Sequence, residues 1–178
     1  MVTNQPWAGL HCDLLAARTS VYDPVGFACS QPVAEPESAE YAAPGFTLDG
    51  RSVRFRVAKI TPTKVGQFVT VWQRSAQGPI RPFDADDGVD LAVISSRDSG
   101  HFGQFVFPGE VLCELGIMSR NGSAGKRGFR VYPPWVTTAD RQARSTQAWQ
   151  VNYFPRLGED GLEDGPVDLA HAHALYRA

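Results

Sequence analysis

The sequence predicts a single α/β domain in which a central mixed β-sheet is flanked by helices. Its 178 residues are the length of one domain and are enough to bury a core without disulfides or metals. Short segments with strand-like alternation follow one another between residues 46 and 132. Apolar residues at helical spacing precede and follow these segments, so we expect helices to cover the sheet.

The first half of the chain predicts one helix and three strands. The helix begins at Pro6 and runs to about Val21, because Leu10, Leu14 and Ala17 recur at helical spacing. Residues 23–44 are rich in Pro, Ala, Ser and Glu and predict an irregular connection with a short helical turn at residues 37–41. Strands are expected at residues 46–48, 53–60 and 67–73, joined as an antiparallel meander by turns at Asp49-Gly50 and Pro62.

The second half alternates between strands and helices. A surface loop at residues 75–88 leads to strands at 89–95 and 104–107. Pro108 then opens a short helix that Gly116 ends, a loop covers residues 120–126, and a strand follows at 127–132. Thr137 or Thr138 caps a last long helix through about Tyr153. We divide the chain into a domain at residues 1–156, with a helical segment at 1–44 and a core at 45–156, and an acidic tail at 157–178 that ends in a helix near 167–176.

Composition excludes several classes of protein. No apolar run approaches the roughly 20 residues that span a bilayer, so we expect no membrane segment. The N-terminus has no basic segment before its short apolar stretch, which predicts a cytoplasmic protein without a secretory signal. Cys12, Cys29 and Cys113 are odd in number and lack CxxC spacing, which argues against a disulfide framework and a zinc site and favours buried free thiols.

The net charge of −2 hides a segregation of charge along the chain. Residues 51–156 carry 15 Lys and Arg against 8 Asp and Glu, a net charge of +7. Residues 1–50 carry −5 and residues 157–178 carry −4. A basic centre between acidic ends is typical of a protein that binds an anion, although the same arginines could pair with the acids across a solvated surface.

Cationic and aromatic residues concentrate in the segment from Ala58 to Arg74 and again near residue 130. Nucleic-acid grooves combine cations that contact phosphates with flat rings on which bases stack. For any one aromatic residue, packing in the core is the commoner role, so the cations carry the better signal. The loops at residues 61–64 and 120–127 are the strongest individual candidates. The candidate nucleic-acid-binding residues are Lys59, Lys64, Trp72, Arg74, Lys126, Arg127, Arg130, Tyr132 and Trp135.

Several segments together resemble one known family. The hairpin AKITPTKVGQFVTVWQR is followed by GPIRPFDADD, GQFVFPGEVL, GKRGFRVYPPW and TQAWQVNYF, and these matches run in order from about Glu37 to Phe154. In this the chain resembles the MepB-like proteins, a family named from a gene beside a multidrug efflux transporter and its repressor. The resemblance implies a restriction-endonuclease-like core and a role in binding nucleic acid, with DNA or RNA as the partner.

That fold also implies an alternative, a nuclease that depends on Mg²⁺. Such a site pairs carboxylates with a nearby lysine, and the candidates are Asp90 and Lys59 as catalytic residues, with Glu40 or Asp49 as further metal ligands. The acid-x-lysine pair of the fold would fall at Gln104-Phe105-Val106, where both acid and lysine are missing. We therefore expect no cofactor and little or no catalysis.

Asp84, Asp86 and Asp87 cluster near Asp90, closely enough to bind a cation. An acidic loop of this kind is more often simply solvated. A third alternative is a module that binds a protein or a small anionic ligand, linked to multidrug resistance. A continuous basic groove would favour nucleic acid, whereas a closed apolar pocket would favour a ligand. Convergence of the carboxylates would favour the nuclease.

Overall fold

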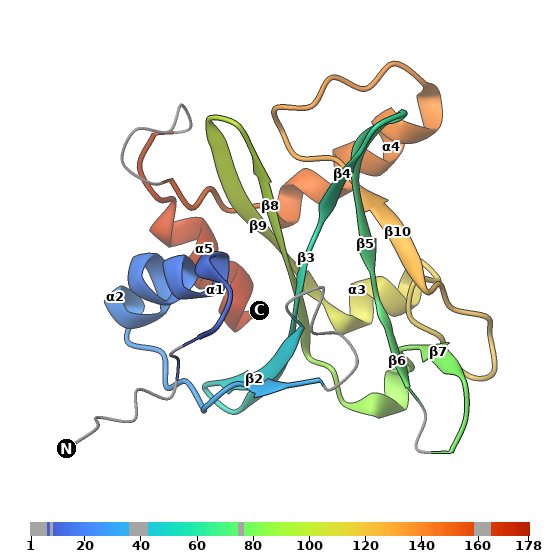
Figure 1. The fold of residues 1–178 in the computed structure, drawn as a ribbon, viewed down its shortest axis with the longest axis horizontal. Coiled ribbons are helices and arrows are strands. Elements are labelled where there is room, and N and C mark those ends of the chain that lie inside the picture. The colour runs from blue at the N-terminus through green and yellow to red at the C-terminus, as the bar shows by residue number, and fades with distance from the viewer. Residues whose placement is uncertain (1–6, 8, 36–42, 75–76, 159–164) are drawn as a thin grey trace.

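A five-stranded mixed sheet forms the centre of the molecule (Figure 1). The structure is a computed structural model and describes residues 7, 9–35, 43–74, 77–158 and 165–178. The sheet has the order β1-β2-β3-β8-β9, in which β3 and β8 are parallel and the other neighbours are antiparallel. The predicted mixed sheet is therefore confirmed. Its strands are β1 (Val33–Ala34), β2 (Pro44–Leu48), β3 (Arg51–Val57), β8 (Leu91–Asp98) and β9 (His101–Pro108).

A second, antiparallel sheet has the order β10-β5-β4, and a third is the pair β6-β7. The predicted meander is wrong at this point, because β3 pairs with β8 rather than with β5. The predicted strand at 53–60 breaks at Ala58, whose N–H donates to Ser95 O at 2.9 Å before the chain enters the second sheet. Lys59 therefore begins a new strand. The strands are β4 (Lys59–Thr61), β5 (Lys64–Thr70), β6 (Trp72–Arg74), β7 (Ile80–Pro82) and β10 (Gly128–Val131).

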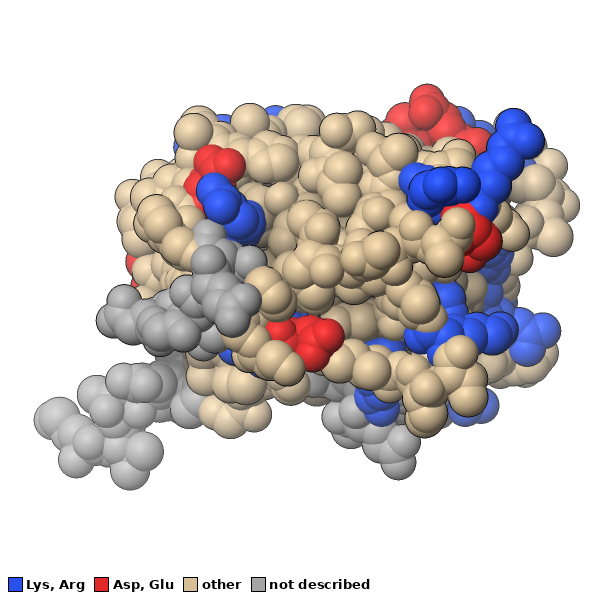
Figure 2. Space-filling view, turned by 90° about the horizontal axis from the view of Figure 1, so that it is seen from above, with Lys and Arg blue, Asp and Glu red and all other residues tan. Residues whose placement is uncertain are grey.

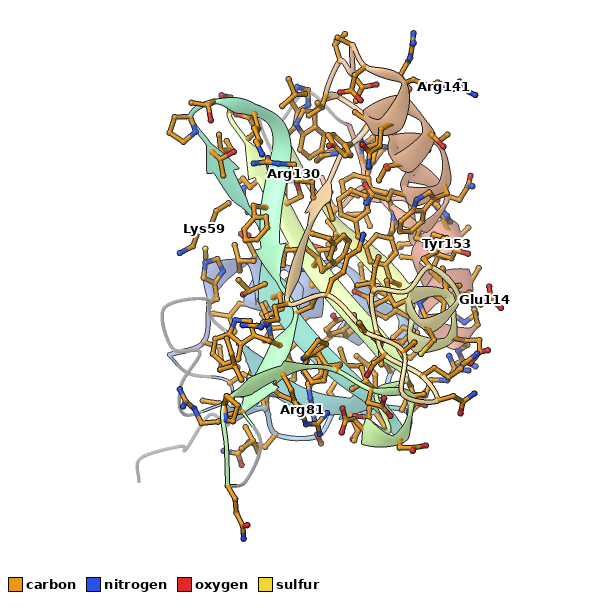
Figure 3. All side chains as sticks on the ribbon, turned by 90° about the vertical axis from the view of Figure 1, so that its right-hand side faces the viewer. Lys59, Arg81, Glu114, Arg130, Arg141 and Tyr153 are labelled. Atoms are coloured by element: carbon orange, nitrogen blue, oxygen red, sulfur yellow. The ribbon has the colours of Figure 1, made fainter. Side chains whose placement is uncertain are left out.

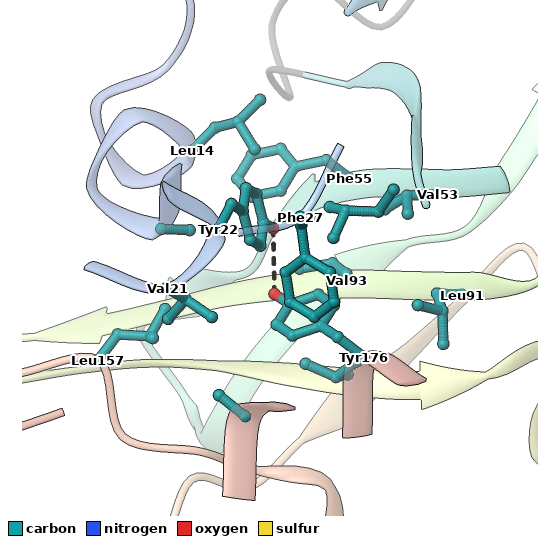
Figure 4. Close-up of a cluster of buried hydrophobic side chains, with 14 of the residues drawn as sticks. Leu14, Val21, Tyr22, Phe27, Val53, Phe55, Leu91, Val93, Leu157 and Tyr176 are labelled. Atoms are coloured by element: carbon teal, nitrogen blue, oxygen red, sulfur yellow. Dashed lines mark hydrogen bonds between the residues drawn. The ribbon is translucent and has the colours of Figure 1, made fainter. Parts of the chain in front are cut away.

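Helices from both ends of the chain cover one face of the central sheet. The N-terminal helical segment consists of α1 (Cys12–Ala17), the π-helical turn η1 (Arg18–Tyr22) and α2 (Asp23–Val25), so its described part begins later than predicted. It lies beside α5 (Leu169–Arg177), as Figure 1 shows. Their apolar side chains meet the sheet in one buried cluster (Figure 4). The cluster includes Leu14, Tyr22, Phe55, Val93, Leu157 and Tyr176.

The C-terminal segment is thus part of the packed core, although its acidic residues 159–164 lie outside the described residues. The predicted final helix near residues 167–176 is confirmed as α5. The division of the chain at residue 156 stays a prediction. The helical turn predicted at residues 37–41 also lies outside the described part of the chain.

The second sheet, α3 (Gly109–Glu114) and α4 (Arg141–Gln150) lie on the other face. Side chains alternate between the two faces of β8 and β9, so these strands contribute to a buried cluster on each face. Those on the face away from α1 and α5 are Ala92, Ile94, Phe105 and Phe107. Short 3₁₀ turns occur at η3 (Ala85–Asp87) and η4 (Val151–Tyr153). Helices therefore flank the central sheet, as the sequence predicts.

Two local predictions are corrected. The last long helix begins at Arg141, and its cap is Asp140, whose carboxylate accepts the Ala143 N–H at 2.8 Å, not Thr137 or Thr138. All three cysteines are free, but none is buried as predicted: Cys12 is exposed, and Cys29 and Cys113 are half-buried. Among the described residues no helix is long and apolar enough to cross a membrane.

Candidate functional site

A groove of about 540 Å³ opens between β10 and α4, at the edge of the second sheet. One wall comes from β10, from the start of β5 and from the loop that precedes β10, and the other wall comes from α4 and the end of α3. The side chains that line it are mostly polar or charged, with three large aromatic rings. They belong to Lys64, Leu115, Ile117, Lys126, Phe129, Arg130, Tyr132, Asp140, Gln142, Ala143, Thr146 and Trp149.

Glutamine side chains of α4 hold the helix against the free edge of β10. The buried Gln150 donates through Nε2 to Arg130 O at 2.9 Å and accepts the Tyr132 N–H through Oε1 at 2.8 Å. Its amide thus takes the place of a neighbouring strand and satisfies two backbone groups of the sheet edge. Gln147 donates to Pro133 O and Val136 O, at 2.9 and 2.8 Å. These bonds set the width of the groove.

Two aromatic rings lie on the outer face of the second sheet, each close to a glycine of the neighbouring strand. A Cβ atom at Gly66 would lie 2.6 Å from the Tyr132 ring, and one at Gly128 would lie 2.5 Å from the Phe68 ring. Gly66 also has a φ of +78°, which other residues adopt only with strain. Glycine is therefore required at both positions for the rings to lie close to the backbone.

The lysines and arginines at the groove form fewer ion pairs with acidic residues than the arginines elsewhere in the molecule do. Lys64, Lys126 and Arg127 are exposed, and within the described part of the chain none of them forms an ion pair. Elsewhere the arginines are largely neutralised: Arg56 pairs with Glu35 at 2.9 Å and Arg97 pairs with Asp13 at 2.8 Å. The cations at the groove therefore remain available to an anion.

Arg130 is held in place by neutral partners. Its Nη2 donates to Thr61 Oγ1 at 2.7 Å, and its Nη1 donates to Val65 O at 3.2 Å. The guanidinium therefore crosses β5 to the β4–β5 hairpin (Figure 3). The loop before β10 is also anchored, because the Lys126 N–H donates to Ile117 O at 2.8 Å.

The start of α4 extends the basic surface. Arg141 and Arg144 are exposed there and have no ion-pair partner among the described residues. Figure 2 shows Lys and Arg gathered on the right-hand side of the molecule, the side that carries α4 and the second sheet. Asp140 is the acidic residue that lines the groove, and its carboxylate is engaged as the helix cap.

The structure brings together part of the predicted nucleic-acid-binding set. Lys64, Lys126, Arg130 and Tyr132 line the groove, and Arg127 lies beside it in a hollow with Arg81 and Ser119. Lys59 is exposed on β4 directly opposite Phe68, so both side chains share the outer face of the second sheet.

The other predicted members lie elsewhere. Trp72 and Arg74 belong to β6, at the far end of the molecule from the β4–β5 hairpin, about 30 Å along the strands from Lys64. Trp135 is half-buried and stacks on His101, with ring centroids 4.9 Å apart. These residues therefore do not take part in the groove.

Sequence reasoning missed the wall that α4 supplies. Gln142, Thr146 and Trp149 follow one another at helical spacing, so the stripe itself could be recognised in the sequence. Nothing in that spacing indicates that β10 lies opposite. Phe68 was visible in the hairpin segment, but its exposure of 40% could not be deduced from alternation alone.

The residues considered for a nuclease do not converge. Asp90 is exposed, and its carboxylate accepts the Ser52 N–H at 2.7 Å at the start of β3. Lys59 follows the other end of that strand, about 20 Å away. Asp49 accepts the Ala28 N–H at 2.7 Å and lies 3.5 Å from Arg177, and Glu40 lies outside the described residues.

A Mg²⁺ ion requires several oxygen ligands about 2 Å from it, and these residues do not supply them at one point. Among the described residues, the one group of His, Cys and acidic side chains close enough to share an ion is His11, Cys12 and Asp13. Both Asp13 oxygens already accept hydrogen bonds, from Ser95 Oγ at 2.7 Å and from Arg97.

Gln104, the position considered from the sequence for the acid of a nuclease, is fully buried in a hydrogen-bonded chain. Its Nε2 donates to Asp13 O at 3.3 Å, and its Oε1 accepts the Tyr176 hydroxyl at 3.0 Å. Tyr176 lies 3.1 Å from the Tyr22 hydroxyl, and burial raises the pKa of both phenols. These residues stabilise the contact of α1 and α5 with the sheet.

The acidic loop has a structural role. Asp87 pairs with Arg81 through two bonds, at 2.7 and 2.9 Å. Asp84 accepts the Ser119 hydroxyl at 2.6 Å, and this bond lowers the pKa of Asp84. Asp84 and Asp87 also form a capping box at the start of the η3 turn, so these two acids order the loop.

Comparisons with known proteins place the chain next to MepB. The MepB-like family model matches residues 35–156. A crystal structure of MepB is 30% identical, covers 85% of this chain and 100% of its own, and superposes with a TM-score of 0.71. A bacterial homing endonuclease is 18% identical over 77% of this chain and 83% of its own, but a TM-score of 0.37 is too low to bear on fold or activity. No curated protein matches.

Proposed function

The chain belongs to the MepB-like family, and we propose that this member binds DNA or RNA in the groove between β10 and α4, largely without regard to base sequence and without catalysis. The observation that carries this proposal is the gathering of cations without acidic partners around the groove. Lys64 and Lys126 provide mobile point charges, and Arg130 provides a guanidinium in a fixed orientation.

The chemistry of the groove fits a polyanion with flat faces. Cations on a hairpin and a loop contact phosphates in any sequence, because the phosphates carry no base identity. Tyr132 and Trp149 supply aromatic surface in the same groove, which phosphate binding alone does not require. The groove is also open and mostly polar, unlike the closed apolar pocket that a small ligand favours.

The scattered carboxylates support binding without cleavage. Phosphoryl chemistry with Mg²⁺ needs oxygen ligands and a cation converging on the scissile phosphate. Asp90 and Lys59 lie at opposite ends of β3, and neither lines the groove. The restriction-endonuclease-like relation, and with it the nuclease, stays a prediction.

Salt dependence tests the electrostatic character of binding. Fluorescence anisotropy of labelled DNA and RNA oligonucleotides should give a slope of log K against log salt of roughly −0.7 to −0.9 for each phosphate contacted. The triple variant Lys64→Ala, Lys126→Ala and Arg127→Ala should flatten that slope and weaken binding. Thermal unfolding should hardly change, because these exposed cations have no ion pair in the described part of the chain.

A control removes three cations that do not line the groove. Arg18→Gln, Arg54→Gln and Arg177→Gln change the net charge equally but lie on η1, β3 and α5. The control should bind nearly as well as the parent. Equal losses in the two triple variants would mean that only overall charge matters and would contradict the groove as the site. Binding that does not respond to salt would contradict nucleic acid as the partner.

A further inference from the structure

From the two rings on the outer face of the second sheet we infer that the preferred partner is single-stranded nucleic acid, with unpaired bases stacked on Phe68 and Tyr132. This inference rests on the proposed function and specifies its substrate class. It concerns the strip formed by Lys59, Phe68, Arg130, Tyr132 and Lys64, here called the ring strip.

The exposure of Phe68 is not explained by packing. Its neighbours in β5, Gln67 and Val69, point inward and are 2% and 1% exposed, whereas Phe68 points outward and is 40% exposed. The far end of its ring lies against the backbone at Gly128, where a larger residue would leave no room for it. A flat apolar surface held rigidly in this way is suited to a flat apolar partner.

The register of the sheet places the second ring further along the same face. Phe68 is opposite Arg130 in β10, so Tyr132 lies two residues further along and above Gly66. The Phe68 ring reaches Gly128 and the Tyr132 ring reaches Gly66, and these positions are four residues apart in the pairing of β10 with β5, about 13 Å along the strands. That separation allows each ring to stack with a different base of one strand.

The cations that surround the rings are placed for the phosphates between such bases. Lys59 and Arg130 occupy the positions directly opposite Phe68 on its two neighbouring strands, and Lys64 lies at the start of the same strand. Figure 3 shows Arg130 across the hairpin and Lys59 at its outer edge. A duplex hides the faces of its bases, so the rings would contribute nothing to duplex binding. Unpaired strands offer bases and phosphates together.

The test compares three probes of equal length: an oligo-dT strand, a strand of abasic sites, and a duplex. The abasic strand keeps the phosphates and lacks the bases. The parent should bind oligo-dT more tightly than the other two. Phe68→Leu and Tyr132→Leu keep apolar bulk above the glycines but remove the stacking surface. Each should weaken oligo-dT binding roughly five- to hundred-fold and leave abasic and duplex binding unchanged.

Ile60→Ala is the matched control, because Ile60 is an exposed apolar residue (59%) on β4 and presents no ring. It should bind all three probes like the parent. Circular dichroism of each variant should match the parent. If a leucine variant fails to fold, the parent protein still tests whether bases contribute to binding, because it should bind oligo-dT more tightly than the abasic strand.

The outcomes separate the two proposals. Equal binding of oligo-dT and abasic strands, or tighter binding of duplex, would overturn the ring strip as a base-stacking surface while leaving nucleic-acid binding intact. Failure of the parent to bind any of the three probes would overturn the proposed function, and the inference with it.

Discussion

At the scale of single residues, Gln104 has a structural role that its place in the sequence does not reveal. The sequence indicates that the acid and the lysine of a nuclease site are missing there. The structure places Gln104 in a buried chain of hydrogen bonds between Asp13 and Tyr176. Burial makes each member of that chain depend on the next, because a polar atom left without a partner there cannot turn to water.

Tyr176→Phe should therefore destabilise the fold more than its size suggests. The change leaves Gln104 Oε1 buried without the hydroxyl that donates to it, which should lower the free energy of unfolding by about 1–3 kcal/mol. Chemical denaturation measures this loss. Tyr22→Phe is the control, because it removes only the bond between the two hydroxyls and should cost about 0.5–1.5 kcal/mol. A larger loss in Tyr22→Phe would contradict this reading of the chain.

The exposed position of the cations was the feature of the site that the sequence predicted best. Lys64 and Lys126 stand in short segments rich in Gly, Pro and Thr, where a charged side chain has no core to meet. Single aromatic residues were not predictable in the same way. Trp135 and Tyr132 are three residues apart, yet the first stacks on His101 and the second lines the groove. Which side each faces depends on elements distant in sequence.

At the scale of elements, local periodicity predicts strands and helices but not their neighbours. The strand patterns near residues 53 and 89 were both visible, whereas their parallel pairing across about 40 residues was not. A parallel pair requires a long connection, and here the connection contains the whole β4–β7 region. The break at Ala58 follows from that topology, since its N–H completes the pairing with β8 before the chain leaves for the second sheet. The groove could not be predicted for the same reason, because its two walls come together only when the whole fold has formed.

The N-terminus of α4 allows the charge of Asp140 to be separated from its role as a helix cap. Asp140→Asn keeps a good cap and removes the acid that lines the groove, so nucleic-acid affinity should rise by about two- to five-fold with little change in melting temperature. Asp140→Ala removes the same charge together with the cap and should cost about 0.5–2 kcal/mol of stability. Anisotropy titrations and thermal unfolding measure the two effects. If Asn weakened binding, Asp140 would be contacting the partner directly.

At the scale of the whole molecule, folding converts a charge pattern along the chain into one in space. The acidic ends pack together, with α1 and α5 on one face of the central sheet, while the basic middle forms the second sheet on the other. Acids of the terminal segments neutralise nearby arginines, as in the pairs Asp13–Arg97 and Asp49–Arg177. The cations at the groove have no such partners in the described part of the chain. The electrostatic field of the protein therefore attracts a polyanion to that face.

The arrangement of the whole fold also bears on catalysis, because a metal site requires side chains from several elements to converge at one point. Asp90 is fixed at the start of β3 by its bond to Ser52, and the turn into the second sheet takes Lys59 to the other end of that strand. No local adjustment closes a gap of about 20 Å. We therefore expect no cleavage when the protein is incubated with single-stranded and duplex DNA and with RNA in Mg²⁺ or Mn²⁺. Asp90→Ala should behave like the parent in this assay and should still bind. Cleavage by the parent that disappears in Asp90→Ala would instead mean that Asp90 meets a metal in a different arrangement, and the nuclease would replace simple binding as the function of the fold.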